Sequence, residues 1–176
     1  MTTAEGAHSH AEGNETHAEG EASHAEGWST ISKGTCSHAE GNDTNALANN
    51  SHAEGSETTA AGGNSHAEGY TTFTIGDSSH AEGYTAVACG IGSHAEGFNT
   101  RTGDVKANAD GNPVDQNGNV TNDYAKMIPL NGEYAHAEGA STVALGNYSH
   151  AEGDATQANG QGSHAEGYFT VANSNY

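Results

Sequence analysis

One short motif, Ser-His-Ala-Glu-Gly, returns along this chain at multiples of seven residues and constrains its fold more than any other feature. The spacing is 7 residues at first and 14 afterwards, and the 42-residue gap between His94 and His136 is three times 14. A fixed period indicates a repeat protein in which each unit packs on its neighbours. The His-Ala-Glu-Gly core begins at His10, His17, His24, His38, His52, His66, His80, His94, His136, His150 and His164.

The composition excludes an ordinary globular core. Of the 176 residues, 32% are hydrophobic and 6% are aromatic, and the formal net charge is -19. These values alone would indicate disorder, but the 25 glycines recur at regular positions, which favours a regular stack. Only four residues are Lys or Arg, so nucleic acid and anionic membranes are poor partners. No apolar run is long enough for direct insertion into a bilayer.

The alternation of residues within each repeat predicts short strands. In Ser-His-Ala-Glu-Gly the small residues lie on one face of a strand, and His and Glu lie on the other. The second half of the unit reads Thr-x-Ala-x-Gly, as in residues 58–62 and 142–146, and alternates in the same way. A coiled coil would need large apolar heptad residues, which this repeat lacks. We therefore predict an all-β solenoid of about eleven 14-residue coils at ~4.8 Å per coil, with a thin interior of small side chains.

We interpret residues 1–176 as a single repeat domain with an insertion at about 103–131, where the period breaks and both prolines occur. The segment from Val114 to Val120 predicts a β-hairpin with an Asn-Gly turn. An insertion on a repetitive scaffold often carries recognition, although a tolerated loop or an interchain clamp fits the same pattern. The candidate recognition residues are Val114, Asn117, Gly118, Val120 and Tyr124.

The two alternating halves resemble the repeats of YadA-like heads in trimeric autotransporter adhesins, over roughly residues 3–102 and 131–174. The Ser-His-Ala-Glu-Gly form is also similar to segments of phage tail fibres and neck appendages. The resemblance implies a left-handed parallel β-roll that forms a side-by-side homotrimer outside the cell, on a bacterial surface or in a phage virion. In adhesin heads, Val and Ile typically flank the central Ala and pack toward the threefold axis. His and Glu occupy those positions here.

Stacked coils place His above His and Glu above Glu, which is repulsive when a row carries like charges. Neighbouring rows of opposite sign would relieve the repulsion, so we expect a polar interface between copies; if its imidazoles are cationic, the oligomer weakens as pH rises. Rows that face water, or that bind metal, are the alternatives, and a mixed face with Phe73, Ile75 and Val143 competes for the trimer axis. The candidate interface residues are His24, Glu26, His38, Glu40, His52, Glu54, His66, Glu68, His80, Glu82, His94, Glu96, His136, Glu138, His150, Glu152, His164 and Glu166.

A stiff multivalent rod suits display. We expect an adhesin head or a tail-fibre segment that attaches to a host receptor or surface ligand through many weak contacts. Because an active site is usually singular, the many identical His-Glu pairs argue against an enzyme, and we expect no catalytic residue, cofactor or dedicated metal site. The coil is also shorter than the roughly 18-residue coil of hexapeptide-repeat acyltransferases. An ice-binding solenoid is an alternative because Thr30, Thr44, Thr58 and Thr72 form a column, although the alternation turns this column inward.

Overall fold

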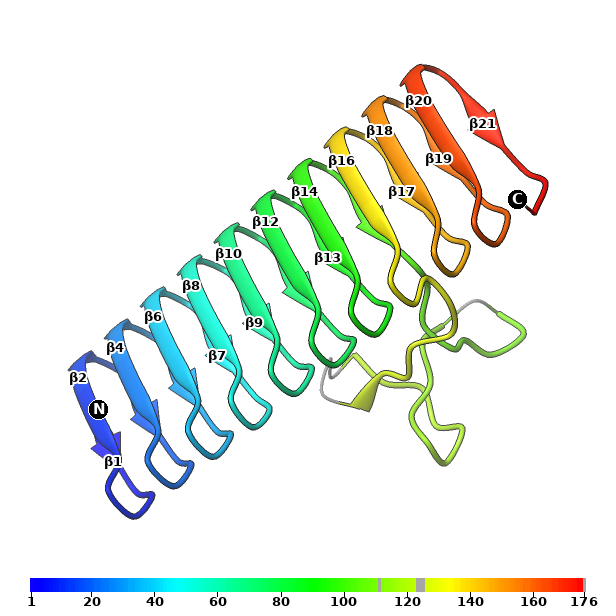
Figure 1. Ribbon diagram of the computed structural model, residues 1–176. Helices are drawn as coiled ribbons and strands as arrows, with labels where there is room; N and C mark the ends of the chain where they lie inside the picture. The colour runs from blue at the N-terminus through cyan, green and yellow to red at the C-terminus, as the bar shows by residue number, and fades with distance from the viewer. Residues whose placement is uncertain (111, 123–125, 176) are drawn as a thin grey trace.

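The computed structural model describes residues 1–110, 112–122 and 126–175 and shows an all-β parallel solenoid (Figure 1). The chain winds between two parallel sheets, and each strand pairs with its equivalent one coil later. The first and last coils, with the two termini, lie at opposite ends of the rod. Within the described ranges, no helix is long and apolar enough to cross a bilayer. The predicted solenoid of 14-residue coils is confirmed.

The first sheet, which we call the long-strand sheet, has ten strands of five residues. Each spells His-Ala-Glu-Gly and one variable residue, and identical residues pair, so that His66 lies opposite His80. The pairing continues across the insertion, where His94 lies opposite His136. The strands are β2 (His10–Asn14), β4 (His24–Trp28), β6 (His38–Asn42), β8 (His52–Ser56), β10 (His66–Tyr70), β12 (His80–Tyr84), β14 (His94–Phe98), β16 (His136–Ala140), β18 (His150–Asp154) and β20 (His164–Tyr168).

The second sheet, the short-strand sheet, has eleven strands of two residues. It contains His17, which pairs with Ile31 rather than with another histidine. The early seven-residue spacing therefore alternates between the two sheets. The strands are β1 (Thr3–Ala4), β3 (His17–Ala18), β5 (Ile31–Ser32), β7 (Asn45–Ala46), β9 (Thr59–Ala60), β11 (Phe73–Thr74), β13 (Val87–Ala88), β15 (Arg101–Thr102), β17 (Val143–Ala144), β19 (Gln157–Ala158) and β21 (Val171–Ala172).

The interior between the sheets is thin and filled by small side chains. Ala67 and Thr72 are fully buried, and Ser65 is 2% exposed. Because each side chain offers only one or two carbons, at ~0.8 kcal/mol per buried methylene, the stack depends heavily on backbone hydrogen bonds between coils. The threonine column that suggested ice binding, Thr30, Thr44, Thr58 and Thr72, is fully buried and offers no surface to ice.

Close stacking places glycine at two positions of most coils, although Ala48 occupies the second position in one of them. Gly69 has a φ of 108°, and a Cβ there would lie 2.2 Å from the carbonyl oxygen of Gly83. Gly76, in the Thr-x-Ala-x-Gly half, lacks a positive φ, but its Cβ would lie 2.1 Å from the carbonyl oxygen of Gly90. The turns also hold residues other than glycine in the left-handed region, such as Thr85 with a φ of 56°. Sequence alone does not indicate these strained positions.

The insertion leaves the solenoid after β15, returns before β16 and projects from one edge of the rod (Figure 1). Isolated antiparallel bridges join Val105 to Pro129 and Ala107 to Pro113. At its base, a Cβ on Gly132 would lie only 2.4 Å from the Cα of Gly103. Because the two ends of the insertion meet, the coils on either side stack as if it were absent.

Candidate functional site

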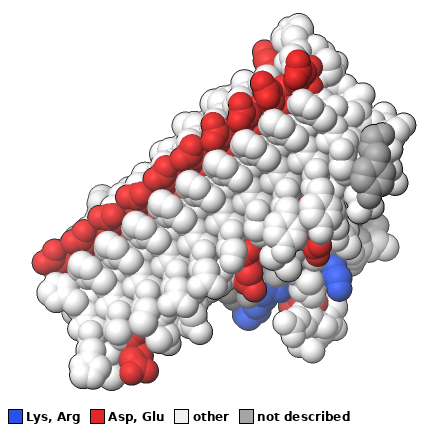
Figure 2. Space-filling model, viewed as in Figure 1, with Lys and Arg blue, Asp and Glu red and all other residues white. Residues whose placement is uncertain are grey.

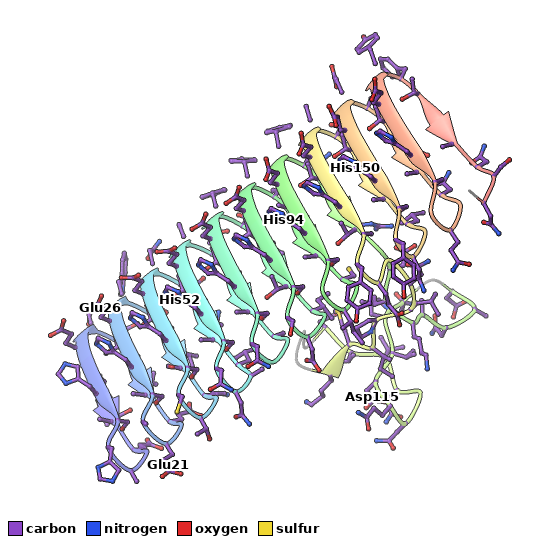
Figure 3. The ribbon with its side chains drawn as sticks, in the orientation of Figure 1. Glu21, Glu26, His52, His94, Asp115 and His150 are labelled. Carbon is purple, nitrogen blue, oxygen red and sulfur yellow. The ribbon has the colours of Figure 1, made fainter. Side chains whose placement is uncertain are left out.

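Two polar columns run along the outer face of the long-strand sheet. The histidine column consists of the first residues of the ten long strands, and the glutamate column consists of their third residues. Figure 2 shows the carboxylates as an almost continuous line along the rod, and Figure 3 shows His52, His94 and His150 projecting in the same way from successive strands. The side chains of His80 and Glu82 are 35% and 36% exposed. The columns are therefore half-buried within a single chain.

The histidine rings stack face to face along the rod. From His24 to His164, neighbouring ring centroids lie 4.7–4.9 Å apart and the ring planes differ by at most 8°. Only the first pair, His10 and His24, meets edge to face, at 77°. The spacing matches the distance between hydrogen-bonded strands. Cationic rings at this separation would repel one another, so the stack favours neutral imidazoles.

Carboxylate oxygens lie close to the Nε2 atoms of the histidine column. Nε2 of His66 lies 3.2 Å from Oε1 of Glu54 in the preceding coil and 3.8 Å from Oε2 of Glu68 on its own strand. Nε2 of His94 lies 3.5 Å from Oε2 of Glu96. Among the described residues, buried Nε2 atoms without a hydrogen-bond partner belong to His24, His38, His52, His80, His94, His136 and His150.

The surroundings of the two columns shift the pKa of several of their groups. Burial and, next, the neighbouring imidazoles lower the pKa of His38, His80 and His150, and the nearby carboxylates only partly offset this effect. Hydrogen bonds to its two column neighbours, together with burial, raise the pKa of Glu26. The sequence left the protonation of the column open, and at these three histidines the lowered pKa favours the neutral imidazole at pH 7.

In five of the ten long strands, the fifth position carries an exposed aromatic side chain beside the glutamate column. Trp28 is 56% exposed. Tyr70, Tyr84 and Phe98 stack in sequence, with centroids 5.0 and 5.3 Å apart. Their side chains are 41–55% exposed, so these three aromatics form a short ladder on the rod surface.

The mixed apolar face lies on the short-strand sheet. Phe73, Val87 and Val143 are partly buried, while Ile75 and Cys89 are 7% and 4% exposed. Both cysteines of the chain are free, and burial raises the pKa of the Cys89 thiol to about 12. Parts of this face are thus already covered within one chain, in contrast to the uniform His-Glu face.

The structure places four of the five candidate recognition residues on one hairpin. Asp115 organises its turn: the Asp115 carbonyl accepts a 3.0 Å hydrogen bond from the amide of Gly118, which has a φ of 82°. Asp115 Oδ1 accepts a 2.9 Å bond from the amide of Asn117, whose side chain is exposed. Tyr124 lies outside the described residues. The four described candidates are Val114, Asn117, Gly118 and Val120, with Val114 bridged to Val120.

No protein-family model matches this chain, and a search of curated proteins finds no match. The inferences about function therefore rest on the repeat and on the geometry of its faces.

Proposed function

We propose that this chain is a structural and adhesive rod without catalytic activity, which acts as a side-by-side homotrimer. It would serve as an adhesin head or a phage tail-fibre segment outside the cell, on a bacterial surface or in a virion. The observation that carries this proposal is the regular stack of ten long strands that share the sequence His-Ala-Glu-Gly, which presents one polar face and one displayed hairpin on a stiff scaffold.

The His-Glu face and the thin interior of the single chain support the trimer. The His-Glu face is flat and periodic, and its side chains are about one-third exposed. A second copy with the same 4.8 Å period could align its own rows of imidazoles and carboxylates with the exposed parts of these side chains. The thin interior adds to the case, because little apolar area is buried within each coil.

Adhesion is supported by the position of the insertion. Its hairpin projects from an edge of the rod, and its tip residues Asn117 and Gly118 are exposed. A trimer would present three hairpins side by side, so individually weak contacts with a host receptor or surface ligand would add through avidity.

Attachment of protein-coated beads to candidate host cells tests the proposal. One set of beads carries the full chain, and the matched control carries the N117A/V120S variant, which changes two exposed tip residues and leaves the solenoid intact. We expect the full chain to attach with a steep dependence on surface density and the variant to lose most attachment. Equal attachment by both, or none by the full chain across bacterial and eukaryotic surfaces, would contradict an adhesive role for the hairpin.

A further inference from the structure

Successive coils bring two imidazoles and one carboxylate together in sets that repeat along the His-Glu face. In each set the three donor atoms lie within 4.8 Å of one another. The sets include His10–Glu12–His24, His38–Glu40–His52, His52–Glu54–His66, His66–Glu68–His80 and His80–Glu82–His94.

The donor types and several of the distances suit a transition-metal ion. Imidazole nitrogen and carboxylate oxygen are the usual non-thiolate ligands of Zn²⁺, with bonds of about 2.0–2.2 Å. Two donors on one tetrahedral ion with such bonds are therefore about 3.4 Å apart. Nε2 of His66 already lies 3.2 and 3.8 Å from the oxygens of Glu54 and Glu68, and Nε2 of His136 lies 3.5 Å from Glu138.

The same nitrogens are otherwise unsatisfied. In the described part of the chain, Nε2 of His38, His52, His80 and His94 is buried and makes no hydrogen bond. For His80 the oxygen of Glu82 is 3.8 Å away, beyond hydrogen-bond distance. Nε2 of His52 and of His94 lie 3.4 and 3.5 Å from oxygens of Glu40 and Glu96 but form no hydrogen bond with them. A cation placed between nitrogen and oxygen would satisfy both atoms. The net charge of -19 also favours cations over anions.

Although the sequence alone led us to expect no dedicated metal site, we propose that the His-Glu face is a linear array of Zn²⁺ sites. Each ion takes Nε2 from two histidines of successive coils and an oxygen of the glutamate that follows the first histidine, and its fourth position opens outward to water or to a donor from a second copy. The paired rings tilt toward each other on binding, because nitrogens up to 4.8 Å apart must approach about 3.4 Å. The proposal is independent of adhesion and holds for one chain or three.

Neighbouring sets share ligands, which predicts the stoichiometry. His52, for example, belongs to two of the sets. Since each ion uses two imidazoles and the column contains one histidine from each of ten strands, we expect saturation at about five ions per chain.

Isothermal titration calorimetry of the metal-free full chain at neutral pH tests the array, with ZnCl₂ as the probe and CaCl₂ as a hard cation that prefers oxygen ligands. The H38Q/H66Q/H94Q/H150Q variant breaks every set named above except His10–Glu12–His24. The matched control, H8N, changes an exposed turn histidine outside the column. We expect about five Zn²⁺ ions for the parent and for H8N, about one for the variant with four histidines replaced, and no Ca²⁺ uptake.

The proposal is overturned if the parent takes up no Zn²⁺ or if the variant with four histidines replaced retains full uptake. It is also overturned if Ca²⁺ binds as well as Zn²⁺, because that would indicate a row of carboxylates that binds cations in general. Far-ultraviolet circular dichroism checks that the variant folds. If it does not, histidine modification of the parent by diethyl pyrocarbonate replaces it. Zn²⁺ should then protect His52 and His80 at least tenfold while His8 stays reactive, and equal modification with and without Zn²⁺ would reject the array.

Discussion

Glycine adopts a positive φ both in the solenoid and in the insertion, but for different physical reasons. Gly69 in a long strand has a φ of 108°, and an added Cβ would lie 2.2 Å from the backbone of the next coil. Gly118 at the hairpin tip has a φ of 82°, and nothing lies within 4 Å of an added Cβ. In the solenoid a residue is therefore constrained by the chain one coil away, whereas in the insertion it is constrained only by its own turn.

The largest effect should come from adding a methyl group at these two glycines. We expect G69A to lower the free energy of unfolding by roughly 4 kcal/mol, because strain combines with a backbone clash, and G118A to lower it by about 1 kcal/mol through left-handed strain alone. Urea unfolding followed by circular dichroism measures both. Similar losses for the two variants would show that contacts between coils are not the main constraint on glycine in the solenoid.

Acid should destabilise the solenoid through its histidine column. The pKa values of His38, His80 and His150 are lowered in the folded chain, so the unfolded chain binds more protons once pH falls below its usual histidine pKa of about 6.5. Stability from these groups is fully present above that pH and is lost as pH falls toward the folded pKa values.

Thermal unfolding in buffer with a chelator measures the acid effect. The H38Q/H80Q/H150Q variant is the comparison, because it removes the three shifted groups. We expect the melting temperature of the parent to fall more steeply between neutral and mildly acidic pH than that of the variant. A parent that becomes more stable over this range would contradict neutral, stacked imidazoles.

A smaller gain is expected from relieving strain in a solenoid turn. Thr85 is β-branched and has a φ of 56°, while the equivalent residue one coil later is Asn99, with a φ of 54°. Since Asn tolerates the left-handed region better than a β-branched residue, T85N should raise the free energy of unfolding by about 0.5–1 kcal/mol. The same urea titration reports it, and a loss of stability would mean that Thr85 makes contacts worth more than its strain.

The smallest change in stability should follow removal of the whole insertion. Deleting residues 104–131 joins Gly103 to Gly132, whose backbones already meet, and restores the 14-residue spacing of the histidines. We expect the melting temperature to change by only a few degrees, because the loop is an independent element on the stack. Unfolding of the shortened chain would show instead that the insertion clamps the coils.

The repeat allowed much of the solenoid to be predicted, because a period of 14 fixes which residues pair and an alternation of two fixes which side chains turn inward. Ala67 and Thr72 are buried for that reason, while His66 and Glu68 face outward. The stacking of imidazoles with buried Nε2 atoms was not predictable, because it depends on rotamers and on neighbouring coils. The non-glycine left-handed turns also escaped prediction, since residues as different as Thr71 and Phe169 adopt them.

The insertion was less constrained by its sequence. Its hairpin was predicted because Asn117-Gly118 marks a turn, and the bridge between Val114 and Val120 agrees with that interpretation. The meeting of its two ends could not be predicted, because it follows from the stacking of the coils on either side. Recognition by the hairpin stays a prediction.

Solution mass tests most directly the central claim that the His-Glu face packs against other copies. Light scattering at neutral pH, over a wide range of protein concentrations, should give three times the chain mass of 17.8 kDa. The E68K/E96K variant, which reverses two charges in the glutamate column, should shift toward the single-chain mass, whereas V120S in the hairpin should not. A well-folded parent with the mass of one chain at every concentration would contradict the account.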